Sequence, residues 1–282
     1  MHEMCAFFVC RSCNSDEITA LTIICIVHSN QLIHVLVYPV KRASSFNELL
    51  SNRDWKDHLI FSDSSSAHLR LNMSPNSRKR GGFKLAYFGT SNPPLFGSSP
   101  AICAKQSFYT KQVERCDGSS MTVRQDIPYD SIKQAQDLIM EIACLNWAQA
   151  LLAMVYAFID EWSEAQARGS GKSKAIDIPN MRFVQAGLAI EQVQLGAEAR
   201  CFLLEELISN SEKGGSFRKY LNNTSSKPCR FKNADDTQRA EFLAFAQHVQ
   251  YFKTKKRAYV ADFQGIFIIH GAVSQLNKCR WR

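Results

Sequence analysis

The chain has 282 residues and a formal net charge of +8, with 45% hydrophobic and 21% charged residues. This balance is typical of a globular protein, and 18 Phe, 8 Tyr and 4 Trp are too many large apolar side chains for a chain that is disordered throughout. The 13 Gly and 8 Pro exclude a collagen-like or low-complexity chain. The length suits one large domain or two small ones.

The positive charge is concentrated in short runs such as 78–80 and 253–257. Most such runs are solvated surfaces or linkers. A nucleic-acid-binding surface would alternate these charges with aromatic side chains, and the sequence shows no such stripe. We therefore expect no nucleic-acid partner.

The 10 cysteines are scattered, and several lie in apolar segments, where a free cysteine packs as a small hydrophobic residue. The chain opens on polar residues rather than on a signal peptide. Both observations favour a reducing, cytoplasmic location. Cys10 and Cys13 have the spacing of metal ligands, but zinc needs about four ligands and no second pair matches them.

The first part of the chain is expected to be a separate N-terminal segment, residues 1–61, of unknown function. Within it, residues 18–40 contain two apolar, β-branched runs with a polar break between them, which predicts a β-hairpin. The polar break makes a membrane span less favoured. Residues 62–80 are rich in Ser, Asn and Arg, which predicts a linker or mobile loop.

The middle of the chain begins with Gly81 and Gly82 and continues to a strand of small and apolar residues at 101–105. A long helix is predicted from Asp130 to Trp162, with Asp130 or the next residue as its N-cap.

The centre of that helix, 142–159, carries no charge and is long enough to cross a membrane. Its polar Asn146 and Gln149 would need partners in lipid, so the pattern favours a buried core helix, and we expect no membrane partner.

The last third of the chain contains strand, helix and loop patterns. Strand and helix patterns alternate over 183–208, and 209–238 reads as a polar loop. Residues 241–251 predict a helix, and 257–263 predict a short strand that runs into Asp262 and Gln264.

Three features in these segments contain side chains that could bind or act on a ligand. Lys105 ends a small-residue strand, and a lysine there supplies a compact positive charge for phosphate oxygens. Glu205 and its neighbour end an apolar strand, as in a hinge between two lobes. Asp262 and Gln264 are two residues apart on a predicted strand, so they point to one face and could act on one substrate or metal.

Together these segments resemble the alpha-kinase family, the atypical serine/threonine protein kinases of the myosin heavy chain kinase and elongation-factor kinase type. The order of motifs is a Gly-containing strand, AICAKQSFY, a long helix, CFLLEELI, GSFRKYLNN, HVQY and ADFQG. The most specific pair is His248 with Tyr251, followed by Asp262 with Gln264 and Gly265. The resemblance covers 81–265.

The resemblance implies a two-lobed α+β protein-kinase-like fold and a site for ATP and Mg²⁺. Lys105 would contact the ATP phosphates, with Gly81 and Gly82 in the nucleotide-binding strand region, and Glu205 would lie near the adenine. These roles follow from the family motif.

The catalytic end of the site is implied in the same way. Asp262 would be the catalytic acid near the hydroxyl that is phosphorylated, and Gln264 would hold the magnesium-bound phosphates. His248 matches one zinc-ligand position of the family.

The residues after Gly265 depart from the family pattern. The family continues with a Thr-Asp-Pro-Gln element, a Gly-x-Gly-Asn loop and a His-x-Cys-x-x-x-Cys stretch, whereas 266–282 reads IFIIHGAVSQLNKCRWR. These residues are therefore expected to be a divergent tail on an incomplete C-terminal lobe. Zinc is not expected, because His248 alone cannot hold it.

The main hypothesis is an alpha-type kinase that transfers phosphate from ATP to Ser or Thr of a protein. The first alternative is a pseudokinase or truncated product that binds a partner without turnover. The second is a basic interaction module with no nucleotide site.

Overall fold

The computed structural model describes residues 30–41, 43, 45–51, 61–114, 122–168, 178–207, 218–222, 225, 227–261, 263–266 and 274–276. The strands are β1 (Asn30–Pro39), β2 (Ser65–Asn72), β3 (Lys79–Arg80), β4 (Lys84–Asn92), β5 (Ala101–Glu114), β6 (Thr122–Pro128), β7 (Met181–Phe183), β8 (Ala186–Glu191), β9 (Cys201–Glu206), β10 (Arg218–Lys219), β11 (Gln264–Ile266) and β12 (Ser274–Leu276). The helices are α1 (Phe46–Ser51), α2 (Ser131–Arg168) and α3 (Ala234–Lys253).

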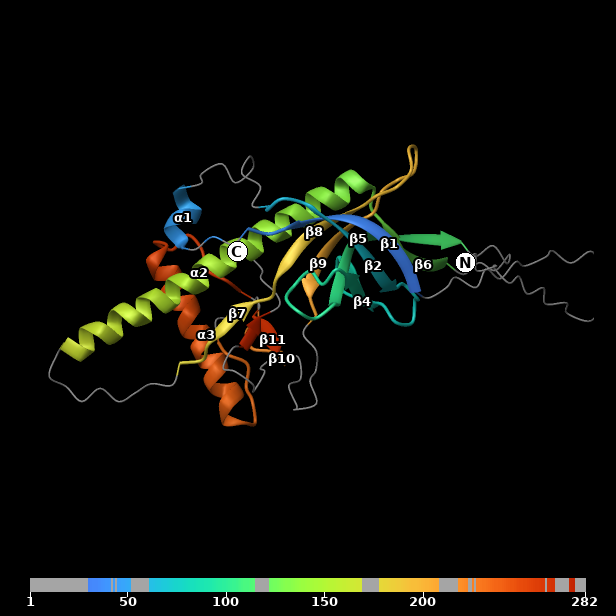
Figure 1. Cartoon of the computed structure of the whole chain (residues 1–282). Coiled ribbons are helices and arrows are strands. Elements are labelled where there is room, and N and C mark those ends of the chain that lie inside the picture. Colours follow the sequence, from blue (N-terminus) through green and yellow to red (C-terminus); the bar gives the residue numbers. More distant parts are fainter. Residues whose placement is uncertain are drawn as a thin grey trace, which may run out of the picture.

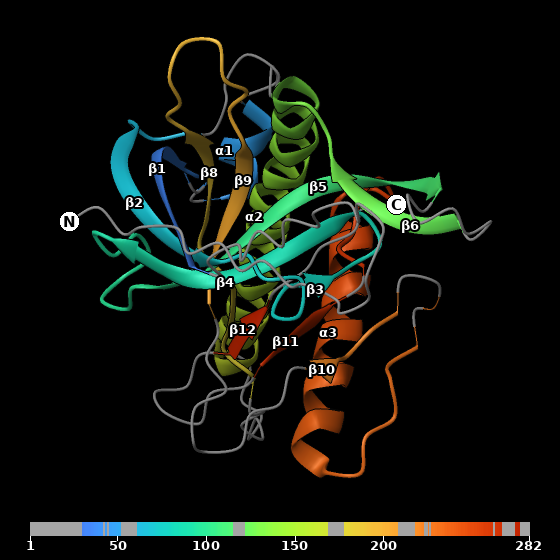
Figure 2. The same cartoon turned by 90° about the vertical axis from the view of Figure 1, so that its right-hand side faces the viewer.

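A large antiparallel sheet forms the first half of the molecule. Its strands follow the order β3-β4-β2-β1-β8-β9-β5-β6, and a further pairing between β4 and β5 closes the sheet on itself. Figure 2 shows how strongly its strands curve. The closed sheet encloses a core, because alternate residues of each strand point inward. Its members include Ile33, Val35, Val37, Leu69, Leu71, Leu85, Ile102, Ala104, Phe202 and Leu204.

The long helix α2 lies against the outer face of this sheet, across β8, β9 and β5 (Figure 1). Its N-terminus is capped as predicted, since the Asp130 carboxylate accepts a hydrogen bond from the backbone N–H of Lys133 at 2.8 Å. The helix is long and apolar enough to cross a membrane, but 56% of its most apolar window is buried inside the protein. Leu138, Ile142 and Leu151 are fully buried in a second hydrophobic core, which α2 shares with α3. This burial confirms a core helix.

The second half of the molecule contains a small sheet and α3. The sheet has the order β10-β11-β12-β7, and Figure 1 shows it between the closed sheet and α3. Helix α3 begins at Ala234 because the Asn233 side chain accepts a hydrogen bond from the backbone N–H of Asp236 at 2.6 Å. The molecule is therefore α+β, as the sequence predicts.

The prediction of a linker or mobile loop at 62–80 is wrong. Strand β2 lies there and pairs with both β1 and β4. Its inward residues Ala67, Leu69 and Leu71 are buried, while the polar residues between them face outward. Strands β1 and β2 thus complete the same closed sheet as the strands after Gly81.

The second apolar run of 18–40 forms β1, which pairs with β2 and β8. The first run, and with it the predicted hairpin, lies outside the described residues. One further expectation differs from the structure. The strand expected at 257–263 begins only at Gln264. The backbone of this segment is hydrogen-bonded to side chains of α3 instead. Gln250 Oε1 accepts from the Val260 N–H at 2.8 Å, and Gln247 Nε2 donates to the Val260 carbonyl at 2.7 Å.

Candidate functional site

Lys105 and Glu205 form an ion pair on the outer face of the closed sheet. Strand β5 pairs with β9 so that Lys105 lies opposite Leu203 and Cys103 opposite Glu205. Residues two apart on a strand share a face, which brings the lysine and the glutamate together. Their Nζ and Oε2 atoms are 2.5 Å apart, and the side chains are only 19% and 6% exposed. Both residues were predicted as site residues from the sequence, and the structure brings them into contact.

The ion pair with Glu205 favours the protonated form of Lys105. Burial disfavours the ammonium form of Lys105, but the negative charge of Glu205 outweighs it, and the net effect is a raised pKa. Burial likewise raises the pKa of the neighbouring Cys103 to about 12, with a further contribution from Glu205. At neutral pH Lys105 is therefore an ammonium, and the Cys103 thiol beside it is un-ionised.

A second lysine on the same face was not singled out by the sequence motifs. Lys84 lies on β4 opposite Ser107, two positions along from the Lys105 register, and it forms an ion pair with Glu141 of α2. Its only sequence signal is its place just after the glycine pair. Two lysines on adjacent strands, each beside a carboxylate, could bind a polyanion.

A small cavity of about 280 Å³ opens beside this second pair. Lys84, Ser107 and Glu141 line it together with aromatic residues. Within the described part of the chain, the buried Ser107 hydroxyl has no hydrogen-bond partner. Buried hydroxyls are normally paired, so this cavity offers a polar group to a ligand.

Gly81 and Gly82 lie in the exposed turn between β3 and β4, just before Lys84. The Gly81 N–H donates to the Lys84 carbonyl at 2.8 Å, which closes the turn. A Cβ atom added to Gly82 would meet nothing within 4 Å. Packing therefore does not require glycine at position 82, and the open space leaves its backbone accessible.

Glu206 ends β9 where the chain leaves the closed sheet, and it binds Arg182 of the small sheet. The guanidinium donates two hydrogen bonds to the carboxylate, at 2.7 and 2.8 Å. Backbone groups add to the contact, since the Glu206 N–H donates to the Gln185 carbonyl at 2.9 Å. This two-point pair ties β7 to β9 at the connection between the two sheets.

Gln264 and His248 lie on the other side of this connection. Gln264 begins β11 and lies opposite Lys219 of β10. Asp262 lies outside the described residues. His248 is exposed on α3. Within the described residues, no group of three or more His, Cys, Asp and Glu side chains is placed to hold a metal ion.

Comparison with solved structures finds a protein of similar fold. The structure of an alpha kinase from Entamoeba histolytica matches with a TM-score of 0.50 and 13% identity, over 90% of this chain and 79% of that one. The match shows a kinase fold. No curated protein sequence matches the chain.

The model of the alpha-kinase family matches residues 81–275, which is most of the chain. The chain therefore belongs to the alpha-kinase family, and the family and fold predicted from the sequence motifs are confirmed. The match runs past Gly265 into the expected tail, where β12 pairs with β11 and β7.

Two structures of myosin heavy chain kinase A are also similar. The apoenzyme alpha-kinase domain has a TM-score of 0.39 and 11% identity, over 90% of this chain and 84% of that one. The complex with ADP has a TM-score of 0.40 and 12% identity, over 88% and 82%.

Proposed function

We propose that this protein binds ATP with Mg²⁺ and transfers the terminal phosphate to a Ser or Thr hydroxyl of a protein substrate in the cytoplasm. Membership of the alpha-kinase family supports the class of reaction. The observation that carries the proposal is the buried ion pair of Lys105 with Glu205, with Lys84 on the adjacent strand of the same face.

The two lysines of this face would supply positive charge to the triphosphate of ATP, although each is paired with a carboxylate in this structure. Lys105 would contact phosphate oxygens while Glu205 holds its ammonium in place, and Lys84 would add a second positive charge. The Gly82 backbone would be free to approach the nucleotide, since nothing packs against it. For Glu205 to lie near the adenine, as the family motif implies, the nucleotide would have to extend along β9.

The acceptor end of the reaction would use residues of the other half. Asp262 would accept or orient the hydroxyl proton, and the Gln264 amide would help to hold the phosphates. Mg²⁺ would enter with the nucleotide and neutralise charge on its phosphates, a task that requires only one or two protein ligands. Phosphoryl transfer of this kind depends mainly on positioning and charge neutralisation.

A second candidate function is nucleotide binding without turnover. Residues 263–282 contain no Asp or Glu, whereas the family pattern has a Thr-Asp-Pro-Gln element after the Asp262 motif. A domain with one carboxylate at this end could bind a nucleotide and a partner protein yet fail to transfer phosphate.

Transfer of labelled terminal phosphate from Mg-ATP distinguishes the two functions. Wild type, Lys105→Ala and Asp262→Ala are tested with the chain itself and with a basic test protein as acceptors. Lys111→Ala is the matched control, since Lys111 is an exposed lysine of the same strand β5. The kinase proposal predicts incorporation that Lys105→Ala and Asp262→Ala abolish and Lys111→Ala preserves. Nucleotide binding with no incorporation by folded wild type would favour the second function.

A further inference from the structure

A larger cavity lies between the C-terminal half of α2 and the N-terminal half of α3. Its volume is about 530 Å³, within the range of about 300 to 1,000 Å³ that is usual for small-molecule sites. None of the residues that line it belongs to the candidate nucleotide site. It is therefore a separate feature of the molecule.

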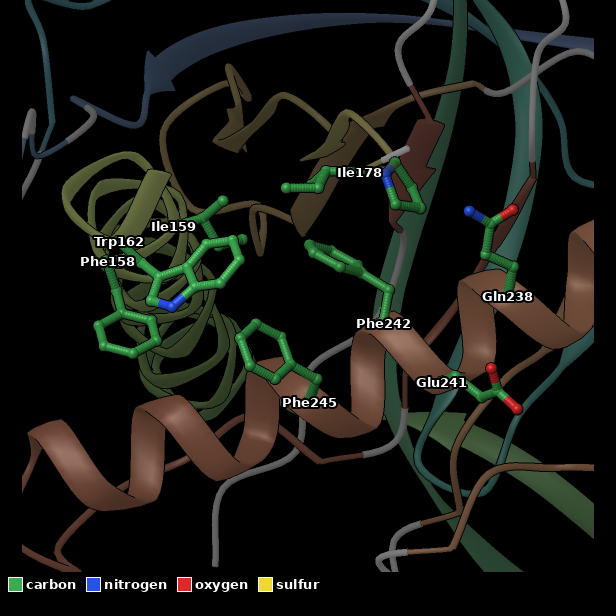
Figure 3. Close-up of a pocket in the computed structure, with 9 residues that line it drawn as sticks. Phe158, Ile159, Trp162, Ile178, Gln238, Glu241, Phe242 and Phe245 are labelled. Carbon is green, nitrogen blue, oxygen red and sulfur yellow. The ribbon is translucent and has the colours of Figure 1, made fainter. Parts of the chain in front are cut away.

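Four aromatic residues line this cavity. Phe158 and Trp162 project from α2, and Phe242 and Phe245 project from α3 toward them (Figure 3). The ring centroids of Phe158 and Phe245 are 6.4 Å apart, so the rings pack directly across the two helices. Trp162 and Phe245 remain 43% and 42% exposed. Solvent, and hence a ligand, reaches this wall.

The polar groups of the cavity lie together at one end. Figure 3 shows Gln238 and Glu241 on α3 at the opposite side of the cavity from Phe158 and Trp162. Among the described residues that line the cavity, Glu241 is the only one with an ionisable side chain, and it is exposed. The cavity thus combines an apolar aromatic wall with a single negative charge at its rim.

One ring of this aromatic cluster already contacts a cation of the protein itself. The Lys253 ammonium lies 4.9 Å from the centroid of the Phe158 ring. Its charge is offset by Glu161, whose carboxylate is 3.6 Å away. Ring faces attract cations through their negative quadrupole, and this contact shows that the geometry of the cluster permits it.

We propose that this cavity binds a hydrophobic organic cation, with an apolar body against the aromatic rings and an ammonium group directed to Glu241. Charge complementarity decides the class of ligand. An amine gains from both the ring faces and the carboxylate, whereas an acid of the same shape is repelled by Glu241.

A matched pair of probes tests the proposal on the full chain. 4-Phenylbutylamine and 4-phenylbutyrate share an apolar body and differ in the sign of their charge. Ligand-observed NMR and Trp fluorescence should show that the amine binds at least about fivefold more tightly than the acid, as expected for one rim charge. Glu241→Gln should bring that ratio near one. Glu164→Gln, an exposed carboxylate of α2 that does not line the cavity, should preserve it.

The position of the ligand is tested separately. Trp162→Ala should weaken the binding of both probes, because it removes part of the shared apolar wall. Thermal unfolding verifies that each variant is folded. The proposal is wrong if neither probe binds at up to about 10 mM, or if the amine and the acid bind equally to wild type. Amine binding that neither Glu241→Gln nor Trp162→Ala alters would lie elsewhere and would also overturn it.

Discussion

Glu205 and Glu206 are consecutive residues at the end of β9, and each holds a different cation. The carboxylate of Glu205 lies 2.5 Å from the Lys105 ammonium, and that of Glu206 accepts two hydrogen bonds from Arg182. Consecutive residues of a strand point to opposite faces, so one strand end can serve both pairs. Glu205 therefore holds the lysine of the candidate site, and the next residue, Glu206, holds the connection between the two sheets.

Replacing Glu205 should lower the free energy of unfolding. Glu205→Gln leaves the Lys105 ammonium buried without its counter-charge, and breaking a buried pair in this way costs about 3 kcal/mol of unfolding free energy. Urea unfolding of wild type and variant at neutral pH measures the loss. A difference below about 1 kcal/mol would show that the pair is solvated and not a buried ion pair.

The same pair predicts a dependence on alkaline pH. The folded-state pKa of Lys105 is raised above its ordinary value of 10.5, so the pair stabilises the fold fully below pH 10.5. That contribution is lost as the pH rises through the raised pKa. The stability difference between wild type and Glu205→Gln should therefore shrink in this range. A difference that stays constant there would contradict the assignment.

Arg182 should matter for both stability and nucleotide binding. Arg182→Ala removes two charge-assisted hydrogen bonds and should reduce the unfolding free energy by about 1 to 3 kcal/mol. Arg200→Ala is the matched control, because Arg200 makes the same kind of pair with Glu191 where β8 connects to β9, with both distances 2.7 Å. Both variants should lose stability.

Nucleotide titration then separates the two arginines. Arg182→Ala loosens the connection next to Glu205 and should weaken the binding of Mg-ATP, by about threefold to tenfold if about 1 kcal/mol of positioning is lost. Arg200→Ala should leave the affinity unchanged. Equal effects of the two variants on affinity would mean that the Arg182 pair has no role in positioning the site.

The carboxylate of Asp236 should govern stability in acid. Burial would raise its pKa, but the Asn233 hydrogen bond and the charges of Arg218 and Arg239 outweigh burial and lower the pKa below 3.8. A lowered folded-state pKa gives stability that is present above pH 3.8 and is lost as the pH falls through the folded value. Asp236→Asn should therefore flatten the acid limb of a plot of Tm against pH.

Asp235→Asn is the control for that experiment. Its side chain is 78% exposed, although it is the preceding residue on the same helix. Its replacement should leave the acid limb as it is in wild type. If the two variants behave alike, the acid limb does not arise from the buried carboxylate.

Gly82 offers a test of nucleotide contact that is independent of stability. A Cβ at Gly82 meets nothing within 4 Å, so Gly82→Ala should change Tm by little. If the nucleotide lies against this turn, as the family resemblance implies, the added methyl group should still weaken Mg-ATP binding. Gly89→Ala is the contrasting variant, because its Cβ would lie 2.1 Å from the Arg70 carbonyl and should prevent normal folding. Unchanged affinity in Gly82→Ala would place the nucleotide elsewhere.

Much of the fold could be predicted where local signals are strong. The small-residue strand at 101–105 and the capped helix after Asp130 are both present. Strand β2 was hidden because its flanks are rich in Ser and Asn, although Ala67, Leu69 and Leu71 alternate with polar residues as a strand requires.

Other elements depend on contacts that no local pattern contains. Helix α3 begins at Ala234, earlier than its apolar pattern, because its first turn is polar and the start is set by the Asn233 cap. The strand expected before Gln264 is absent from the described residues because α3 side chains bind Val260.

The candidate site shows the same division. Lys105 and Glu205 were predicted from motifs, and the antiparallel register of β5 and β9 explains why they meet. Lys84 was missed because its partner Glu141 lies on a distant helix, and only the tertiary structure brings the two together.

Calorimetric titration of Mg-ATP into the folded protein tests most directly whether the face around Lys105 is a nucleotide site. We expect one site in wild type, affinity about 10- to 100-fold weaker in Lys105→Ala from the lost charged contact, and wild-type affinity in Lys111→Ala. No binding by folded wild type, or equal affinity in wild type and Lys105→Ala, would contradict it.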